Sequence, residues 1–236
     1  NQKHLLTVKQ LSSEEVSEIL SLAEKLKAEH KMGKLNHLLT GKSLAMSFEK
    51  PSSRTRVSFD VAMYQLGGYA VNLSMQEIQL GKRESIADVA RTLSRFVDGI
   101  MIRTFSHNIV EELSRFSTIP VINGLTDAAH PCQALADIFT IKEKFGKLEG
   151  VNLAFIGDGN NVCNSLIAAA ARTKMRMTIS APKSYDPSET ILQEARKHTS
   201  IVLERDPIKA VRDADVIYTD VWTSMGQEKE ARKRRK

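Results

Sequence analysis

Two consecutive segments decide the fold: Ser43-Leu-Ala-Met-Ser-Phe48 and Glu49-Lys-Pro-Ser-Ser-Arg-Thr-Arg-Val-Ser-Phe-Asp60. The first is short and apolar, which predicts a buried strand. In the second, serine, threonine and arginine residues precede apolar residues at helical spacing, and Gly67-Gly68 closes the predicted helix. Another apolar run, Tyr69-Ala-Val-Asn-Leu73, predicts the next strand. A strand, a helix and a strand in this order indicate a parallel sheet.

The alternation of strands and helices continues along the chain. A serine-capped helix is predicted from residue 12, before the first strand. Apolar runs predict further strands at 99–103, 120–123, 151–156, 175–180, 201–203 and 216–219. Helical patterns fall between them at 86–96, 110–117, 132–145, 164–173, 189–198 and 208–211. The sequence therefore predicts an α/β fold with two doubly wound parallel-sheet domains, residues 1–147 and residues 148–236.

The composition narrows the class of protein and the kind of ligand. With 42% hydrophobic and 26% charged residues, the chain resembles ordinary soluble proteins. It has neither an apolar run of the roughly 18 residues that a membrane span needs nor the apolar segment of a secretory signal. Cys132 and Cys163 form no metal-ligand or disulfide pattern. We therefore expect a cytoplasmic protein without a membrane partner and without a metal site.

The net charge of +6 suits anionic small substrates better than nucleic acid. Part of the excess lies in the basic stretch at 228–236, and a short basic end is more often a solvated helix or tail. The few aromatic residues do not alternate with basic ones as a platform for single-stranded nucleic acid requires. Nucleic acid is therefore not expected as a partner.

The residues after the first predicted strand form a candidate anion site. A helix N-terminus carries unpaired N–H groups and a partial positive charge. Hydroxyls of Ser52, Ser53 and Thr55 add donors, and the fork of Arg54 matches phosphate oxygens. The alternative is a serine cap with solvated arginines. Because Arg54 and Arg56 oppose the helix dipole unless an anion balances them, the stretch predicts a phosphate site.

Further polar clusters follow later predicted strands. They are Arg103, His130-Pro-Cys-Gln133, Gly157-Asp-Gly-Asn-Asn161 and Asp220. Taken singly, His130 is more readily explained as a helix cap, with Pro131 at the first helical position, and Arg103 as a surface residue. The two asparagines fit capping and substrate binding equally well. A dinucleotide fingerprint fails because Val162 stands where its third glycine belongs. Since parallel sheets bind ligands at the carboxyl ends of their strands, the clusters together predict one binding region.

Four motifs together resemble the aspartate/ornithine carbamoyltransferase family, in order and spacing. They are Ser52-Ser-Arg-Thr-Arg56, His130-Pro-Cys-Gln133, Gly157-Asp-Gly-Asn-Asn161 and Asp220-Val-Trp-Thr-Ser-Met-Gly226, whose Ser-Met-Gly element resembles the ornithine branch. The resemblance implies two α/β domains with the active site in the cleft between them, in homotrimers or multiples of trimers. It implies carbamoyl transfer from carbamoyl phosphate to the δ-amine of L-ornithine without a cofactor. The products would be L-citrulline and phosphate, in arginine biosynthesis or the arginine deiminase pathway.

Carried over position by position, the resemblance implies two sets of site residues. The carbamoyl phosphate ligands are Ser52, Ser53, Arg54, Thr55, Gln79, Arg103, His130 and Gln133, of which Arg54, Thr55, Arg103 and His130 are catalytic. The ornithine ligands are Asn161, Asp220, Ser224 and Met225.

The resemblance also implies what several of these positions do. Thr55, Arg103 and His130 would hold the carbonyl oxygen as charge develops on it. Gln79 matches a loop position that reaches a neighbouring subunit's site. Most relatives have threonine where this chain has Ser53, a mild change because the contact there is expected to involve backbone.

Two features depart from the family pattern. Four strands are predicted after residue 150, whereas such sheets usually have about five or six. The family's His-Cys-Leu-Pro motif, whose cysteine contacts the δ-amine, is absent, as are a later carbonyl-binding arginine and the last helix. We therefore expect the chain as written to bind carbamoyl phosphate and to turn over poorly. The alternatives are a carbamoyltransferase for putrescine or an acylated ornithine, and a truncated, non-catalytic relative that binds carbamoyl phosphate.

Overall fold

A computed structural model describes residues 4–74 and 84–221 of the chain. The predicted site residues Gln79, Ser224 and Met225 lie outside these ranges. The chain divides into unit 1, Asn1–Leu135, and unit 2, Ala136–Lys236. The predicted domain boundary between residues 147 and 148 stays a prediction.

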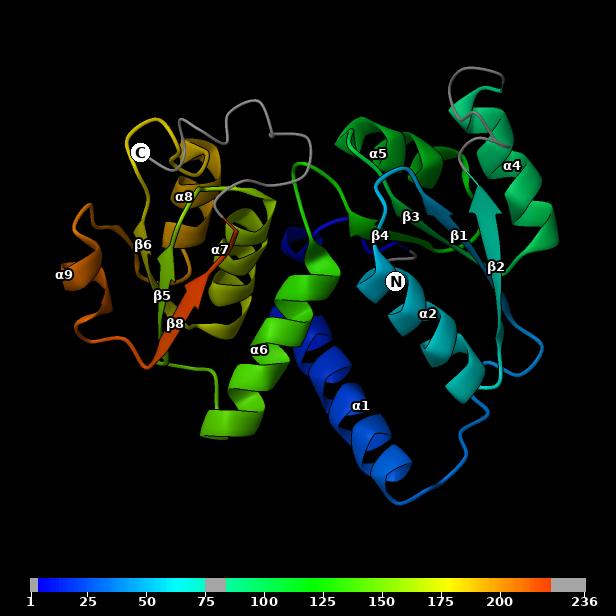
Figure 1. The fold of residues 1–236 in the computed structure, drawn as a ribbon, viewed down its shortest axis with the longest axis horizontal. Coiled ribbons are helices and arrows are strands. Elements are labelled where there is room, and N and C mark those ends of the chain that lie inside the picture. The colour runs from blue at the N-terminus through cyan, green and yellow to red at the C-terminus, as the bar shows by residue number, and fades with distance from the viewer. Residues whose placement is uncertain (1–3, 75–83, 222–236) are drawn as a thin grey trace. The chain divides into compact units, whose positions relative to one another are not determined.

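Unit 1 is built around a parallel sheet with the strand order β2-β1-β3-β4 (Figure 1). Its strands are β1 (Ser43–Phe48), β2 (Tyr69–Ser74), β3 (Gly99–Arg103) and β4 (Val121–Leu125). Its helices are η1 (Val8–Gln10), α1 (Ser13–Lys31), α2 (Ser53–Gln65), α4 (Ile86–Phe96) and α5 (His107–Phe116), and α6 (Pro131–Phe145) starts in this unit.

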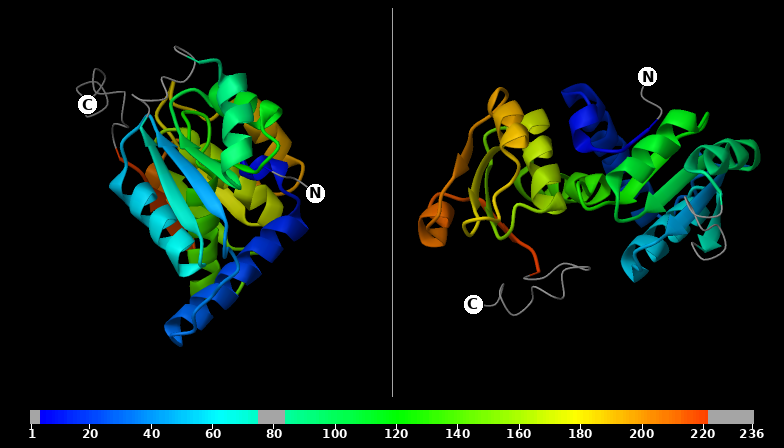
Figure 2. Two further views of the ribbon diagram at one scale, coloured as in Figure 1. Left: turned by 90° about the vertical axis from the view of Figure 1, so that its right-hand side faces the viewer. Right: turned by 90° about the horizontal axis from the view of Figure 1, so that it is seen from above.

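Alternating side chains on the strands bury both faces of this sheet. Ile100 and Ile102 of β3 join one apolar cluster with residues of α4 and α5. Met101, between them in sequence, joins a second cluster with Met63 of α2. The sheet therefore lies between α2 on one face and α4 with α5 on the other, as the left view of Figure 2 shows.

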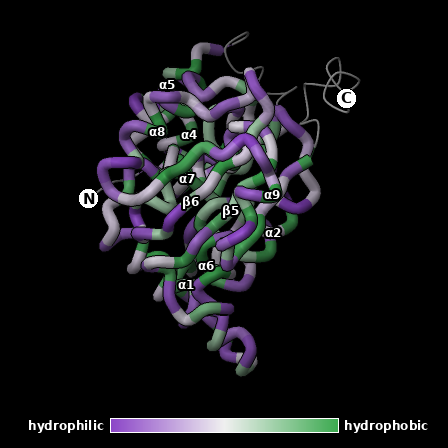
Figure 3. Tube along the Cα trace, turned by 90° about the vertical axis from the view of Figure 1, so that its left-hand side faces the viewer, coloured by the Kyte–Doolittle hydropathy of each residue, from purple (hydrophilic) through white to green (hydrophobic). Residues whose placement is uncertain are grey.

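Unit 2 has a second parallel sheet with the different order β7-β6-β5-β8. Its strands are β5 (Asn152–Ile156), β6 (Arg176–Ser180), β7 (Ile201–Leu203) and β8 (Val216–Thr219). Its helices besides most of α6 are α7 (Asn161–Thr173), α8 (Glu189–Arg196) and α9 (Pro207–Val211). Phe155 of β5 and Leu166 of α7 are fully buried. Figure 3, coloured by hydropathy, shows hydrophobic stretches where this unit's strands lie.

Each sheet has a point where its strand order reverses. In unit 1 the chain passes from β1 to β2 on one side and then crosses to β3 on the other. In unit 2 it passes from β5 through β6 to β7 and then crosses to β8. Ligands of open α/β sheets bind beyond the carboxyl ends of the strands at such points. The loops after β1 and β3, and after β5 and β8, are therefore the places to look for function.

The fold prediction is confirmed: every predicted strand and helix is present, and the strands form two parallel sheets. Several helices begin a few residues earlier than the apolar pattern predicts. The helix predicted from residue 110 begins at His107, because the polar residues His107 and Asn108 open its first turn ahead of the apolar ones. Across the described residues, no helix has the length and apolar character to cross a membrane.

Candidate functional site

The N-terminus of α2 carries the first polar group of unit 1. Ser52 is the N-cap residue with an extended backbone, and its Oγ accepts a hydrogen bond from the Thr55 amide at 3.2 Å. The same Oγ donates to Thr55 Oγ1 at 3.1 Å. Ser53 and Arg54 open the helix and are exposed, whereas Ser52 and Thr55 are half-buried. The serine cap is therefore real, and it orients the Thr55 hydroxyl as well.

Arg103 joins this helix N-terminus from the end of β3. Phe48 of β1 is paired in register with Arg103, so the loop after β1 starts beside it. The Arg103 side chain donates from Nη1 to Thr55 Oγ1 at 3.2 Å. Arg103 is 8% exposed, and its Nε is buried without a hydrogen-bond partner among the described residues. Ser52, Arg54, Thr55 and Arg103 are called the anion site below.

No carboxylate of the described residues balances the positive charges of the anion site. Burial lowers the pKa of Arg103, and the positive charge of Arg54 lowers it further. Within the described ranges, no carboxylate forms an ion pair with Arg54 or Arg103. A buried, incompletely hydrogen-bonded cation is costly, and an anion bound between the two guanidinium groups would remove that cost. The arrangement thus suits a phosphate at a helix N-terminus.

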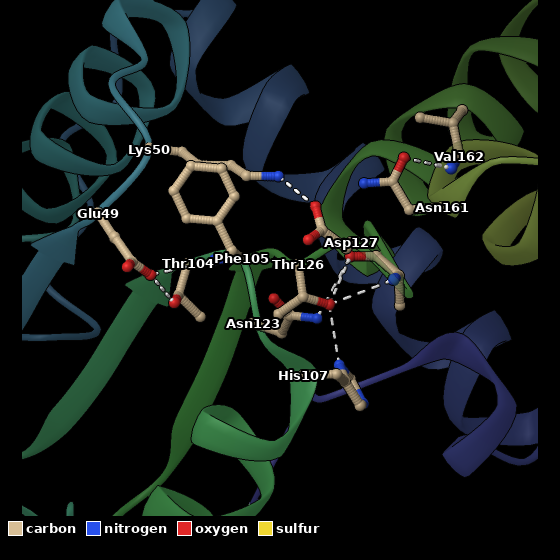
Figure 4. Close-up of polar contacts among 11 residues, drawn as sticks. Glu49, Lys50, Thr104, Phe105, His107, Asn123, Thr126, Asp127, Asn161 and Val162 are labelled. Carbon is tan, nitrogen blue, oxygen red and sulfur yellow. Dashed lines mark hydrogen bonds and ion pairs between the residues drawn. The ribbon is translucent and has the colours of Figure 1, made fainter. Parts of the chain in front are cut away.

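Contacts between loops hold the backbone around the anion site (Figure 4). The Glu49 amide donates to the Arg103 carbonyl at 2.8 Å. The Glu49 carboxylate accepts from the Thr104 hydroxyl and, at 3.2 Å, from the Phe105 amide. Because Glu49 follows β1 and the other residues end or follow β3, these bonds lock the two loops together.

Lys50 connects these two loops to the loop after β4. The contacts of Glu49 and Lys50 with these loops are called the lock below. Its side chain is 5% exposed and forms an ion pair with Asp127, while its Nζ lies 4.4 Å from the centre of the Phe105 ring. The Asp127 amide in turn donates to the Phe105 carbonyl at 2.9 Å. Figure 4 shows Lys50 reaching across the ring to Asp127. Sequence reasoning missed Lys50 and Asp127, because a pair 77 residues apart leaves no local signal.

The loop after β4 leads to His130 and Gln133. Thr126 Oγ1 accepts from the Ala129 amide at 3.2 Å and lies 2.9 Å from His107 Nδ1. Burial lowers the pKa of His107. His130, half-buried, precedes α6, and its carbonyl accepts from the Ala134 amide at 3.2 Å as a capping residue's does. Gln133 is half-buried in the first turn of that helix.

The second polar group lies where the order of the unit 2 sheet reverses. Asn160 is the N-cap of α7, and its Oδ1 accepts from the amides of Val162 and Cys163, both at 3.0 Å. Its Nδ2 donates to Asp220 Oδ2 at 2.8 Å, and Asp220 Oδ1 accepts from the Val221 amide at 2.7 Å. Asp220 is half-buried and has no cationic partner among the described residues. Asn160 and Asp220 are called the carboxylate site below.

Asn160 holds Asp220 in place, and the assignment of its neighbour Asn161 as an ornithine ligand stays a prediction. Asn161 is the first residue of α7, and its Oδ1 accepts from the next amide, that of Val162, at 2.9 Å. The sequence signal for Asn160 was present, since asparagine is a favoured N-cap residue. The even choice between capping and ligand binding was too simple, because Asn160 caps the helix with one atom and holds a carboxylate with another.

Of the two cysteines, Cys163 is buried and Cys132 is half-buried. Burial raises the pKa of Cys132 to about 12 and raises that of Cys163 as well, so neither is a thiolate at neutral pH. No group of three or more histidine, cysteine, aspartate or glutamate side chains gathers there in a way that could hold a metal ion.

These features define a parallel α/β protein with a cationic, phosphate-type site on one sheet and a carboxylate site on the other. The sequence model of the "Aspartate/ornithine carbamoyltransferase, carbamoyl-P binding domain" matches residues 3–143. That of the "Aspartate/ornithine carbamoyltransferase, Asp/Orn binding domain" matches residues 149–236. The chain therefore belongs to the aspartate/ornithine carbamoyltransferase family, as the resemblance of its motifs predicted.

Individual relatives agree with this assignment. Ornithine carbamoyltransferase of Anoxybacillus flavithermus is 54% identical, with 98% of this chain covering 76% of that protein. The Archaeoglobus fulgidus ornithine carbamoyltransferase is 55% identical over the same shares. The solved structure of ornithine carbamoyltransferase from Pyrococcus furiosus has a TM-score of 0.95 at 50% identity, over 99% of this chain and 76% of that one. A Pyrococcus furiosus relative is named "Ornithine carbamoyltransferase, anabolic", at 51% identity over 99% of this chain and 76% of that protein.

Proposed function

We propose that this protein transfers the carbamoyl group of carbamoyl phosphate to the δ-amine of L-ornithine, giving L-citrulline and phosphate. The observation that carries the proposal is the buried Arg103, bonded to Thr55 in the first turn of α2 and lacking a carboxylate among the described residues. The family assignment and the names of the relatives support the choice of substrates.

In this reaction the anion site binds the phosphate group of carbamoyl phosphate. The N–H groups of the first turn of α2 and the guanidinium groups of Arg54 and Arg103 supply donors and positive charge. The lock formed by Glu49 and Lys50 keeps these donors in place before the substrate arrives. Donors that are already oriented cost no reorganisation during the reaction, which is the main source of electrostatic catalysis.

The chemical step needs no nucleophile from the protein. The lone pair of the neutral δ-amine attacks the carbamoyl carbon and forms a C–N bond, while the bond from that carbon to the phosphate oxygen breaks. Charge develops on the carbonyl oxygen, where Thr55, Arg103 and His130 donate hydrogen bonds. The amine loses one proton, and the leaving phosphate takes up one. The other proposed ligands within the described ranges are Ser53, His130, Gln133 and Asn161. Gln79, Ser224 and Met225, which lie outside those ranges, remain proposed ligands as well.

The carboxylate site selects the amine substrate. Asp220, held by Asn160, pairs with the α-ammonium group of L-ornithine and leaves the δ-amine as the nucleophile. An acylated ornithine has no α-ammonium group and therefore loses this ion pair. Putrescine keeps a second ammonium group and lacks the α-carboxylate.

The test is a comparison of three amines under identical conditions. The purified protein is incubated with carbamoyl phosphate and either L-ornithine, putrescine or N-acetylornithine, and the ureido product and phosphate are measured. The proposal predicts slow formation of L-citrulline and an equal amount of phosphate with L-ornithine, and far less product with the other two amines. Preference for another amine would assign a sister activity. Calorimetric binding of carbamoyl phosphate without product from any amine would assign a non-catalytic binding protein.

Two further parts of the proposal concern context. We propose a homotrimer, and the exposed apolar residues of α2 and β2 support an interface there: Val57, Tyr64 and Tyr69 are 58%, 82% and 70% exposed. Light scattering coupled to gel filtration measures the assembly, and a monomer would contradict it. Of the two pathways, we propose arginine biosynthesis, in line with the anabolic name of one relative.

A further inference from the structure

A loop of unit 2, residues 181–188, is tied down by one arginine that sequence reasoning did not single out. Arg205 follows β7 and forms a two-point ion pair with Asp186, with distances of 2.5 Å from Nη1 to Oδ1 and 2.8 Å from Nη2 to Oδ2. Its Nη1 also donates to the Ala181 carbonyl at 2.8 Å. One guanidinium thus holds the loop near both of its ends, in the geometry that lysine cannot reproduce.

The tied loop lies directly on the glycine turn after β5. The Gly159 amide donates to the Tyr185 carbonyl at 2.6 Å. A Cβ atom at Gly159 would lie 2.1 Å from the Pro187 nitrogen, so the two backbones touch where only glycine fits. The next residue after Gly159 is Asn160, which caps α7 and donates to Asp220. A continuous chain of contacts therefore runs from Arg205 to the carboxylate site.

The backbone of this loop is strained, so we expect its conformation to change if Arg205 is removed. Ser184 has a positive φ of 74°, in the left-handed region that side chains other than glycine rarely adopt. Such a conformation persists only where surrounding contacts impose it. Arg205 and Asp186 are partly exposed, with 47% and 34% of their side chains accessible. An exposed ion pair adds little to overall stability, so the effect of breaking this one falls on the loop.

We propose that Arg205 and Asp186 are positioning residues for the amine substrate: they press residues 181–187 onto Gly159 and so hold Asn160 and Asp220 in the orientation that receives the substrate's ammonium group. This inference rests on the proposed function. It assigns a role in specificity to two residues that do not touch the substrate themselves.

The experiment compares Arg205→Gln, Arg205→Lys and Asp186→Asn with a matched control, Arg176→Gln. Arg176 is also an exposed arginine of unit 2 that donates to a backbone carbonyl, Gly150 O at 3.0 Å, but it stands at the opposite end of the sheet. Two quantities are measured on the full chain. The first is hydrogen exchange of the Gly159 amide without any ligand, and the second is the set of steady-state constants for both substrates.

We expect exchange of the Gly159 amide to become at least about tenfold faster in Arg205→Gln and Asp186→Asn. The KM for L-ornithine should rise about five- to tenfold, while kcat and the KM for carbamoyl phosphate stay within about twofold. Arg205→Lys should give an intermediate result, and Arg176→Gln should behave as the wild type. A purely structural tie would leave the ratio of the two KM values unchanged.

The outcomes separate the two proposals. If Gly159 exchange in Arg205→Gln and Asp186→Asn matches the control, or if both KM values change together, the inference is wrong and the proposed function stands. If the wild-type protein forms no citrulline, the proposed function fails and the role in specificity fails with it. If Arg205→Gln does not fold, Asp186→Asn decides alone, because it removes the same ion pair and leaves the arginine's bond to the loop.

Discussion

In unit 1 the strand order reverses between β1 and β3, whereas in unit 2 it reverses between β5 and β8. Both reversals carry a helix N-terminus capped by a polar side chain, Ser52 in one and Asn160 in the other. The charges differ: the first reversal holds guanidinium groups without a carboxylate partner, and the second holds a carboxylate without a cationic partner, among the described residues. The comparison shows that one or two side chains decide whether a site at this topological position suits an anionic or a cationic group.

The two sites also differ in how they are held. Around the anion site, contacts join the loops after β1, β3 and β4, and the Lys50 side chain among them is almost fully buried. Around the carboxylate site, the described contacts are hydrogen bonds to Asp220 from the Asn160 side chain and the Val221 amide, and an exposed ion pair one layer further out. The anion site is therefore expected to be the more rigid of the two, and the carboxylate site the one that tolerates adjustment.

Replacing Arg103 by methionine should abolish binding at the anion site while sparing the fold. Loss of a buried charge that pairs with a bound anion costs about 2–5 kcal/mol, so carbamoyl phosphate affinity should fall at least about 30-fold. Because the unliganded cation is incompletely hydrogen-bonded, thermal stability without ligand should stay constant or rise. Calorimetry and thermal unfolding measure the two effects. The control is Arg115→Met, an exposed arginine of α5, and equal losses of affinity in both variants would contradict the assignment.

Replacing Asp220 by asparagine should impair the other site alone. A hydrogen bond to a charged group contributes about 1.5–3 kcal/mol, so the KM for L-ornithine should rise about 10- to 100-fold. Carbamoyl phosphate binding should stay unchanged. The matched control is Asp215→Asn, because Asp215 accepts from the Asn152 amide at 2.8 Å and precedes β8, whereas Asp220 follows it. A parallel loss of carbamoyl phosphate affinity in Asp220→Asn would show that the two sites are not separate in function.

Replacing Lys50 by methionine should loosen the anion site from a distance. The substitution keeps the buried aliphatic stem and removes the ion pair with Asp127 and the contact with the Phe105 ring. We expect carbamoyl phosphate affinity to fall about tenfold, since misplaced binding groups lose much of their effect. Lys42→Met serves as the control: Lys42 pairs with Asp98 at 2.9 Å before β1, while Lys50 follows it. Unchanged affinity in Lys50→Met would mean that the loops need no such lock.

The smallest effect concerns pH and His107. Burial holds the pKa of His107 in the folded protein below its ordinary value of 6.5, so the unfolded chain binds a proton first as the pH falls. The contribution of neutral His107 to stability is therefore present above pH 6.5 and is lost below it. His107→Gln should flatten part of the fall in unfolding free energy between pH 6.5 and about pH 5, measured by urea unfolding. The exposed His198 of unit 2 provides the control, and an equal flattening in His198→Gln would refute the explanation.

Local sequence patterns predicted the elements well because short apolar runs, glycine closures and serine caps are local signals. The sequence placed Arg103 and the first turn of α2 at the carboxyl ends of parallel strands, and the structure brings them together there. The strand orders of the two sheets were not predictable, because pairing depends on contacts between distant segments. The ion pair of Lys50 and Asp127 was not predicted for the same reason. The hydrogen bond from Asn160 to Asp220 was not predicted either, because it joins residues 60 positions apart.

The most direct test of the account is a crystal structure of the protein with carbamoyl phosphate bound. The account predicts phosphate oxygens within about 3 Å of the Arg103 guanidinium, the Thr55 hydroxyl and the first amides of α2. A phosphate bound elsewhere, with Arg103 still lacking a partner for its Nε, would contradict it.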